Sequence, residues 1–139
     1  MKTLILTVGL PRSGKTWWAH KQDCPIVNPD SIRLALHGQR YIQLAEPFVW
    51  AIATVMVRAL FLAGADKVIL DATNTTYARR NAWKSDDWQT WFKVIPTSKQ
   101  ECLNRAAAEG DTYIPPIIER QAMQFEPLTE DEAERAWWA

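Results

Sequence analysis

Residues 9–16 read GLPRSGKT, and they follow directly on the apolar run TLILTV at residues 3–8. The run is short, apolar and rich in β-branched residues, which predicts a buried strand that ends at Gly9. The next eight residues fit the pattern G-x-x-x-x-G-K-[ST], and a helix is expected from about Lys15 to about Gln22. Strand, glycine-containing loop and helix in this order predict a loop that surrounds phosphate groups.

The residue types in this loop suit a bound nucleoside triphosphate. Gly9 and Gly14 permit backbone angles that a side chain would forbid, so the loop N–H groups can point inward. Lys15 is expected to reach the β- and γ-phosphates, and Thr16 is expected to offer its hydroxyl to Mg²⁺. The alternative is a tight glycine turn with an exposed lysine. The residues expected to contact ATP are Gly9, Pro11, Arg12, Ser13, Gly14, Lys15 and Thr16.

Strands and helices alternate along the rest of the chain. Further strands are expected within residues 25–30, 66–72 and 91–96, and helices within 30–36, 46–63, 75–87, 99–109, 116–125 and after Thr129. The spacing of Ser98 with Glu101, and of Thr129 with Glu132, matches a capping box at two of the helix starts. The pattern predicts one α/β domain over residues 1–139, a three-layer fold with a small, mostly parallel sheet of about four strands.

Composition limits the possible partners and locations. Sixteen basic and sixteen acidic side chains give no net charge, so contact with nucleic acid would need a local basic patch. Cys24 and Cys102 form no metal-binding pattern, which favours a reduced, cytoplasmic setting, and no signal peptide is predicted. The apolar run at residues 48–63 contains Arg58, which is costly in lipid. We therefore expect a buried helix of a soluble domain rather than a membrane span.

Asp71 ends the run VILD at residues 68–71. A carboxylate at the end of a parallel strand lies at the edge of the sheet where ligands bind. We expect Asp71 to hold Mg²⁺ through water or to form a hydrogen bond with Thr16, because a phosphate-binding loop needs such a partner. The alternative is a strand-end aspartate that caps the next turn.

Asp30 and Arg33 are three residues apart, so on a helix they would project from the same face. The carboxylate could accept a proton from an acceptor hydroxyl, and the guanidinium could hold an anionic group of the same acceptor. The alternative is structural, with Asp30 as the N-cap of a helix and Arg33 as a solvated side chain.

Four blocks of sequence carry a resemblance to a known family. They are GLPRSGKTWWA (9–19), VNPDSIR (27–33), LDATNTTYARRNAW (70–83) and CLNRAAAEGDTYIPPIIER (102–120). In this order they resemble the kinase domain of phage polynucleotide kinase, over about residues 3–124. The resemblance implies a P-loop kinase fold with a helical lid at about residues 99–120. It also implies that the γ-phosphoryl group of ATP passes, with Mg²⁺, to a polynucleotide 5′-hydroxyl.

The resemblance also implies roles for single residues. Lys15 and Thr16 would hold ATP and Mg²⁺, with Asp71 near the metal. Asp30 would be the general base for the 5′-hydroxyl, and Arg33 would bind the adjacent phosphate of the acceptor. Arg105 would be a lid arginine near the ATP phosphates.

One position departs from the family. The lid carries a second arginine just before its glycine, and here that place is taken by Glu109, before Gly110. An arginine that stabilises the transferring phosphoryl group can be worth ~10³–10⁵ in rate, and a glutamate cannot do this. Arg105 or Arg120 would then take the role, or the reaction would be slow, or the acceptor would differ.

The expected helix at 75–87 carries the best candidate basic patch, with Arg79, Arg80 and Lys84. Together with Asn74 beside the site, Arg79 and Arg80 are predicted to contact the acceptor, because a 5′-end enzyme needs mostly phosphate contacts. The alternative is a solvated helix face. Most of the eight Trp residues are expected to pack in the core or at its edges rather than to stack on bases.

Three functions remain open from the sequence. The first is a polynucleotide 5′-hydroxyl kinase, and the second is a kinase of a nucleoside, nucleotide or other small metabolite. The third is a nucleotide-binding regulatory protein, against which the Asp30–Arg33 pair argues, since a binder needs no base there. The sequence does not indicate an oligomeric state.

Overall fold

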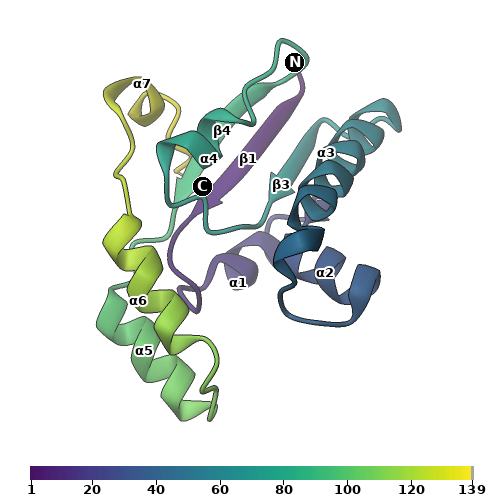
Figure 1. The fold of residues 1–139 in the computed structure, drawn as a ribbon. Coiled ribbons are helices and arrows are strands. Elements are labelled where there is room, and N and C mark those ends of the chain that lie inside the picture. Colours follow the sequence, from purple (N-terminus) through teal and green to yellow (C-terminus); the bar gives the residue numbers. More distant parts are fainter. Residues whose placement is uncertain (139) are drawn as a thin grey trace.

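The computed structural model describes residues 1–138, and a small parallel sheet lies at its centre (Figure 1). Its strands are β1 (Thr3–Val8), β2 (Ile26–Val27), β3 (Lys67–Leu70) and β4 (Gln89–Val94). They form a four-stranded sheet in the order β2-β3-β1-β4, and every neighbouring pair is parallel. The predicted fold class and the predicted number of strands are confirmed.

Helices connect the strands in the order that the sequence predicted. They are α1 (Lys15–His20), α2 (Pro29–His37), the 3-10 turn η1 (Gln43–Ala45), α3 (Glu46–Leu62), α4 (Tyr77–Asn81), α5 (Lys99–Ala108), α6 (Pro115–Gln124) and α7 (Glu130–Ala133). Thr129 and Glu132 form a complete capping box at α7. At α5 only half of the predicted box forms, because Ser98 accepts from the Glu101 N–H while the Glu101 carboxylate binds Arg105.

Alternate side chains of β1 divide the core into two layers. Leu4, Leu6 and Val8 face the side covered by α3, whereas Ile5 faces the side where Trp18 and Ala19 of α1 pack. Helices α5 and α6 form a third cluster around Cys102, Ala106 and Ile118. The result is the three-layer arrangement expected, with the α5–α6 pair set to one side as the lid (Figure 1).

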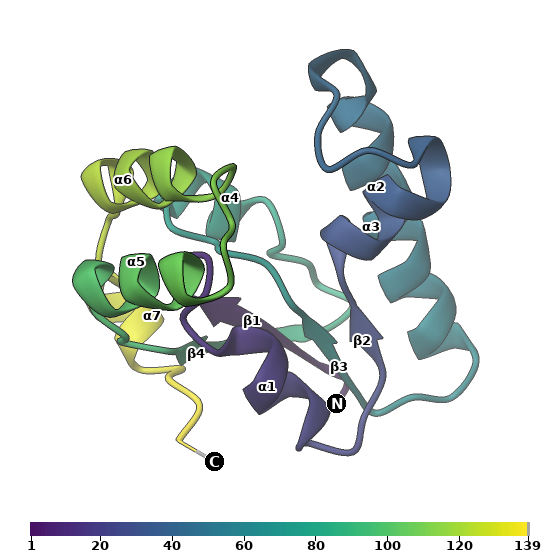
Figure 2. The ribbon, with the colours of Figure 1, turned by 90° about the horizontal axis from the view of Figure 1, so that it is seen from below.

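The carboxyl ends of all four strands meet at one edge of the sheet because the strands are parallel. Figure 2 views the molecule from below and shows α5 and α6 on one side of this edge, with α2 and α3 on the other. Ligands of open α/β sheets bind at this edge, between the loops that leave the strands. The predicted site residues follow β1, β2 and β3 at this place.

Helix α3 corrects the prediction of a fully buried helix. Val49, Ala53, Val57 and Phe61 lie on one face and pack in the core. On the outer face Phe48, Val55 and Leu62 are 66%, 65% and 89% exposed. Gln43–Leu62 is long and apolar enough to pass for a membrane span by composition, but one of its faces packs against the sheet. An unbroken apolar run did not reveal which face would be covered.

The predicted surface helix at residues 75–87 is also much shorter than expected, since α4 ends at Asn81. The chain then turns so that Trp83 and Trp88 enter the core. The Trp88 indole N–H donates to the Trp83 carbonyl oxygen at 2.9 Å, and Thr90 Oγ1 donates to the same oxygen at 3.2 Å. Burial of two large rings therefore outweighs continuation of the helix.

The C-terminal segment pairs with the outer edge of β4. The Phe92 N–H donates to the Arg135 carbonyl oxygen, and the Trp137 N–H donates to the Phe92 carbonyl oxygen at 2.7 Å. Trp137 also meets Trp91 edge to face, with ring centroids 5.8 Å apart. This segment covers a strand edge that would otherwise offer unpaired backbone groups.

Candidate active site

The loop between β1 and α1 requires its two glycines for different reasons. A Cβ atom on Gly9 would lie 2.8 Å from Ser13 Oγ and 2.9 Å from the Ile95 carbonyl oxygen, so no side chain fits there. Gly14 has a φ of 104°, a left-handed conformation that favours glycine. Thr97 Oγ1 donates to the Ser13 carbonyl oxygen at 2.7 Å and ties the loop to the segment after β4.

Lys15 lies folded back over this loop. Its ammonium donates to the Leu10 carbonyl oxygen at 2.7 Å, and the residue is only 9% exposed. Burial lowers the pKa of Lys15 to about 8, although Asp71 and Asp30 act in the opposite direction. The electrostatic influence of both carboxylates on one ammonium indicates that the ends of β1, β2 and β3 converge on the same site.

Thr16 and Asp71 are in direct contact. Thr16 Oγ1 donates to Asp71 Oδ2 at 2.7 Å, which is the hydrogen bond that the sequence predicted for this pair. Asn28 Nδ2 donates to the same carboxylate oxygen at 3.1 Å. No cluster of three or more His, Cys, Asp or Glu residues forms a ready-made metal site within residues 1–138. A hydroxyl beside a carboxylate is nevertheless the kind of oxygen donor set that fits Mg²⁺ shared with phosphates.

Asp30 and Arg33 stand on the first turns of α2, across from the loop. The N-cap of α2 is Asn28, not Asp30: Asn28 Oδ1 accepts from the Asp30 N–H at 2.8 Å and from the Ser31 N–H. The Asp30 side chain is 82% exposed, and Arg33 Nη1 donates to its Oδ1 at 2.7 Å. The two residues share a face, as their spacing predicted, and the structural alternative for Asp30 as an N-cap does not hold.

Glu46 fixes Arg33 from the start of α3. The Arg33 guanidinium donates to both Glu46 oxygens, Nε to Oε2 at 2.9 Å and Nη2 to Oε1 at 2.7 Å. Both side chains are mostly buried, at 14% and 16% exposed. Burial alone would lower the pKa of Arg33, but Glu46 and Asp30 hold it above its ordinary value. Arg33 therefore stays charged and is held in one orientation.

Arg105 of the lid lies against the phosphate-binding loop. Its Nη1 donates to the Arg12 carbonyl oxygen at 3.1 Å, and its Nε donates to Glu101 at 3.1 Å. The lid and the phosphate-binding loop are therefore in direct contact through Arg105, whose role at the phosphates stays a prediction.

Glu109 and Asp111, in the turn after α5, both bind the side chain of Arg12. Asp111 accepts from Arg12 Nη2 at 2.8 Å and from Arg40 at 3.1 and 3.2 Å. The lid turn thus contacts the phosphate-binding loop on one side and the α2–η1 segment on the other.

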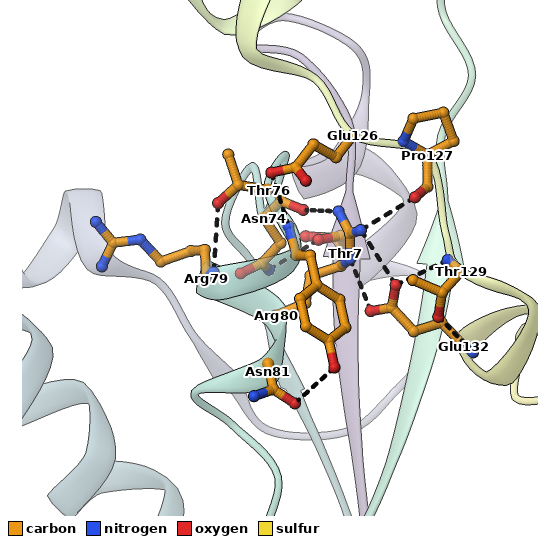
Figure 3. Close-up of polar contacts among 11 residues, drawn as sticks. Thr7, Asn74, Thr76, Arg79, Arg80, Asn81, Glu126, Pro127, Thr129 and Glu132 are labelled. Atoms are coloured by element: carbon orange, nitrogen blue, oxygen red, sulfur yellow. Dashed lines mark hydrogen bonds and ion pairs between the residues drawn. The ribbon is translucent and has the colours of Figure 1, made fainter.

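Two predicted acceptor contacts are wrong because the side chains lie inside the protein (Figure 3). Asn74 is 1% exposed, and its Nδ2 donates to the Thr7 carbonyl oxygen at 2.8 Å. Arg80 is fully buried and donates from Nε and Nη2 to Glu132 at 2.8 and 3.1 Å, and from Nη1 to the Asn74 carbonyl oxygen at 3.0 Å. Asn74 ties the segment after β3 to β1, Arg80 ties it to α7, and neither side chain is available to a substrate.

Arg79 differs from its neighbour. It is exposed, and its guanidinium lies 4.3 Å from the ring centre of Trp50 on α3. The predicted basic patch is thus reduced, because Lys84 lies in the turn beyond α4 and Arg80 points inward.

Sequence reasoning missed three residues of the site: Asn28, Glu46 and Asp111. The Asn-Pro-Asp order at residues 28–30 is a usable signal, because Pro favours the first helical position after a cap. Glu46 and Asp111 carried no signal, since their partners are brought to them only by the folded chain.

A family model described as "AAA domain" matches residues 4–127 of the chain. Among solved structures, a chain of the Pnkp1/Rnl/Hen1 complex is 26% identical with a TM-score of 0.68, and the match covers 75% of this chain and 38% of that one. A chain of the Pnkp1/Rnl/Hen1 RNA repair complex is 21% identical with a TM-score of 0.73, covering 88% and 43%. A gluconokinase from Sinorhizobium meliloti 1021 is 16% identical with a TM-score of 0.63, covering 96% and 79%. The chain therefore spans less than half the length of the first two.

Proposed function

Because the chain belongs to the AAA domain family and has the fold of P-loop kinases, we propose that it is a phosphotransferase that acts on polynucleotide ends. The γ-phosphoryl group of ATP passes to a 5′-hydroxyl group, as in the polynucleotide kinases that the sequence resembles. The proposed setting is the cytoplasm.

The observation that carries this proposal is the pairing of Asp30 with a fixed Arg33. The Asp30 carboxylate is open to solvent, and the neighbouring Arg33 is oriented by the two hydrogen bonds that it donates to Glu46. A binding protein needs no such arrangement at this edge. An acceptor that combines a hydroxyl with a nearby phosphate fits it well, and the 5′ end of a polynucleotide has both groups.

The reaction uses these residues in distinct roles. The loop N–H groups and Lys15 bind the phosphates, and Lys15 neutralises charge on the β- and γ-phosphates. Asp30 orients the 5′-hydroxyl and accepts its proton as the oxygen attacks the γ-phosphorus. The bond between that phosphorus and the bridging oxygen breaks, and ADP leaves with the bond's electron pair.

The remaining groups orient the reactants. Thr16 and Asp71 would hold Mg²⁺, which supplies charge neutralisation when it is bound. Arg33 holds the acceptor phosphate next to the hydroxyl, which fixes the acceptor in line with the γ-phosphate. Arg105 stands over the loop, where a guanidinium can contact the transferring group.

A small-molecule acceptor is the second candidate. The burial of Arg80 and the lack of net charge leave little basic surface for a long polynucleotide. The chain also matches the fold of a gluconokinase over almost its whole length. A phosphorylated metabolite with a free hydroxyl would use Asp30 and Arg33 in the same way.

The experiment is a transfer assay with γ-labelled ATP and Mg²⁺. The acceptors are 5′-hydroxyl DNA and RNA oligonucleotides, 3′-nucleotides, nucleosides and sugars. The proposal expects label on oligonucleotides, lost in Asp30→Asn and kept in the control Asp86→Asn, whose exposed carboxylate lies in the turn before β4. Label on monomers alone contradicts it in favour of the second candidate. Tight ATP binding without transfer to any acceptor would favour a regulatory nucleotide-binding protein.

A further inference from the structure

Arg12 is a conspicuous side chain in the phosphate-binding loop because its backbone is in the left-handed region, with a φ of 67°. That conformation is unfavourable for a residue with a Cβ atom, and glycine would adopt it freely. A loop that already contains two glycines keeps an arginine at the strained position. Strain retained at a binding loop points to a function of the side chain itself.

Two carboxylates of the lid turn hold this guanidinium. Nη2 donates to Asp111 at 2.8 Å and Nη1 donates to Glu109, while the Arg12 side chain remains 30% exposed. Arginine has five N–H donors, so the Nε–H and one more N–H on each terminal nitrogen remain for other acceptors. The geometry leaves Arg12 able to bind an anion while both carboxylates keep hold of it.

Asp111 is fixed independently of Arg12. It accepts from the Tyr113 and Ile114 N–H groups at 3.0 and 3.2 Å, and from both terminal nitrogens of Arg40. Arg40 in turn lies 4.4 Å from the ring centre of Tyr113. The carboxylate that orients Arg12 therefore belongs to a rigid corner of the lid.

Electrostatics explains why the cation is needed. Like charges at close range near a protein surface repel each other, so carboxylates next to a phosphate-binding loop would oppose the nucleotide. Arg12 is bonded to both Glu109 and Asp111 and belongs to the loop itself. A phosphate bound in the loop would then meet the guanidinium rather than the acids.

We propose that the side chain of Arg12, beyond the contact of its loop with ATP, contacts the transferring phosphoryl group through the guanidinium, and that Glu109 and Asp111 are positioning residues that orient it. This rests on the nucleotide-binding part of the proposed function and not on the identity of the acceptor. It also accounts for the glutamate at position 109. The guanidinium that contacts the phosphoryl group comes from Arg12 of the loop, and the lid supplies the carboxylates that orient it.

The test compares the affinities of the Mg²⁺-loaded protein for ADP and for ADP–aluminium fluoride, a mimic of the transferring state. In Arg12→Gly we expect the affinity for ADP–aluminium fluoride to fall about 10²-fold, the loss usual for one preorganised donor to developing charge. The affinity for ADP should fall much less, and the melting temperature should change little, because relief of the backbone strain offsets the lost ion pairs and Asp111 keeps its bonds from Arg40, Tyr113 and Ile114.

A double variant tests the division of roles between loop and lid. Arg12→Gly with Glu109→Arg returns a guanidinium from the lid side, and it should recover roughly tenfold or more of the loss. The control Lys99→Ala removes an exposed lid ion pair with Glu119 and should change neither affinity.

Unchanged binding of ADP–aluminium fluoride by Arg12→Gly would overturn the proposal. Equal loss of both affinities together with a clearly lower melting temperature would overturn it too, because that pattern marks a purely structural residue. A wild-type chain that binds neither ligand would overturn the proposed nucleotide-binding function as well, which separates the two failures.

Discussion

The donor side and the acceptor side of the candidate site are built in different ways. The donor side is mostly local: Gly9 to Thr16 form one continuous segment of loop and first helical turn, and Asp71 joins it from the end of β3. The acceptor side is assembled from a distance, since Arg33 takes its orientation from Glu46, 13 residues away at the start of another helix. The donor loop can be recognised from a short motif, whereas the acceptor side exists only in the folded chain.

This contrast suggests how the two sides can change independently. A loop whose shape depends on its own glycines tolerates little variation. An acceptor side that depends on a few ion pairs between α2 and α3 can adopt a new substrate by changing those pairs. Substitutions on each side should therefore leave different kinetic signatures.

The largest effect is expected from Lys15→Met on the donor side. The variant keeps the length and the apolar character of the buried stem and removes the charge that would bind the β- and γ-phosphates. We expect kcat/KM for phosphoryl transfer to fall by about 10³-fold or more. Steady-state kinetics with ATP and with the best acceptor measure this. A change confined to the KM of the acceptor would contradict the division into a donor side and an acceptor side.

Arg80→Met should act on stability and on neither side of the site. Removing one partner of a buried ion pair leaves Glu132 charged and unpaired, which costs about 3–5 kcal/mol of unfolding free energy. Urea denaturation measures the loss, and Arg79→Met is the matched control because its neighbouring guanidinium is exposed.

The same pair makes the stability sensitive to acid. Burial would raise the pKa of Glu132, but hydrogen bonds from Arg80 and from the Thr129 N–H hold it below the ordinary value. Its contribution is therefore present above the ordinary glutamate pKa and is lost as the pH falls through the lowered value. An equal loss of stability in Arg79→Met would contradict the assignment of the two arginines.

Glu46→Gln should affect the acceptor side alone. The amide cannot match the charge of Arg33, so the guanidinium loses its fixed orientation. We expect the KM of the acceptor to rise by about tenfold, the cost of weakening one charge-assisted pair, with little change in the KM of ATP. A parallel rise in both KM values would show that the donor and acceptor sides are coupled through α3, and it would contradict their independence.

The smallest expected effect is a pH dependence of ATP binding. With a pKa of about 8 in the free protein, Lys15 loses its proton above that pH, and phosphate binding restores it. ATP affinity should therefore be about fourfold lower at pH 8.5 than at pH 7 through this group, with proton uptake on binding.

Calorimetry in buffers of different ionisation enthalpy measures that uptake, and Lys15→Arg should abolish it. The stability of the free protein has the opposite pH dependence and increases as the pH rises. The folded pKa lies below the unfolded one, so the cost of burying the ammonium disappears as the pH rises from about 8 toward the ordinary lysine value. Absence of proton uptake near pH 8.5 would contradict the buried position of Lys15.

The sequence predicted the fold and the Thr16–Asp71 contact because these depend on local pattern. Short apolar runs closed by Gly9, Asp71 and similar residues define strands, and parallel strands bring their ends together whatever lies between them. The same local reasoning failed at Arg80, where three basic residues on one expected helix were interpreted as a basic patch for the acceptor. Arg80 is buried because it pairs with Glu132, which is 52 residues away in sequence.

The prediction of a buried helix at α3 was wrong for a related reason. A run that is apolar on every side does not mark the face that will be covered, so the sequence predicted a buried helix and did not reveal that Phe48 and Val55 would be exposed. Asn28 was within reach of sequence reasoning, since the residue before Pro29 occupies a favoured capping position. Glu46 could not be predicted in this way, because nothing in the sequence around it indicates a contact with Arg33.

The contact between Arg80 and Glu132 also imposes an order on synthesis. Arg80 leaves the ribosome 52 residues ahead of its partner, and until then its guanidinium keeps its water. The turn that follows Asp71 is bonded to Thr7 of β1 through Asn74, and both of these residues are synthesised early. Arg80 gains its carboxylate partner only when α7 arrives. The emerging chain therefore carries a recognisable phosphate-binding loop well before the buried ion pair behind the segment after β3 can form.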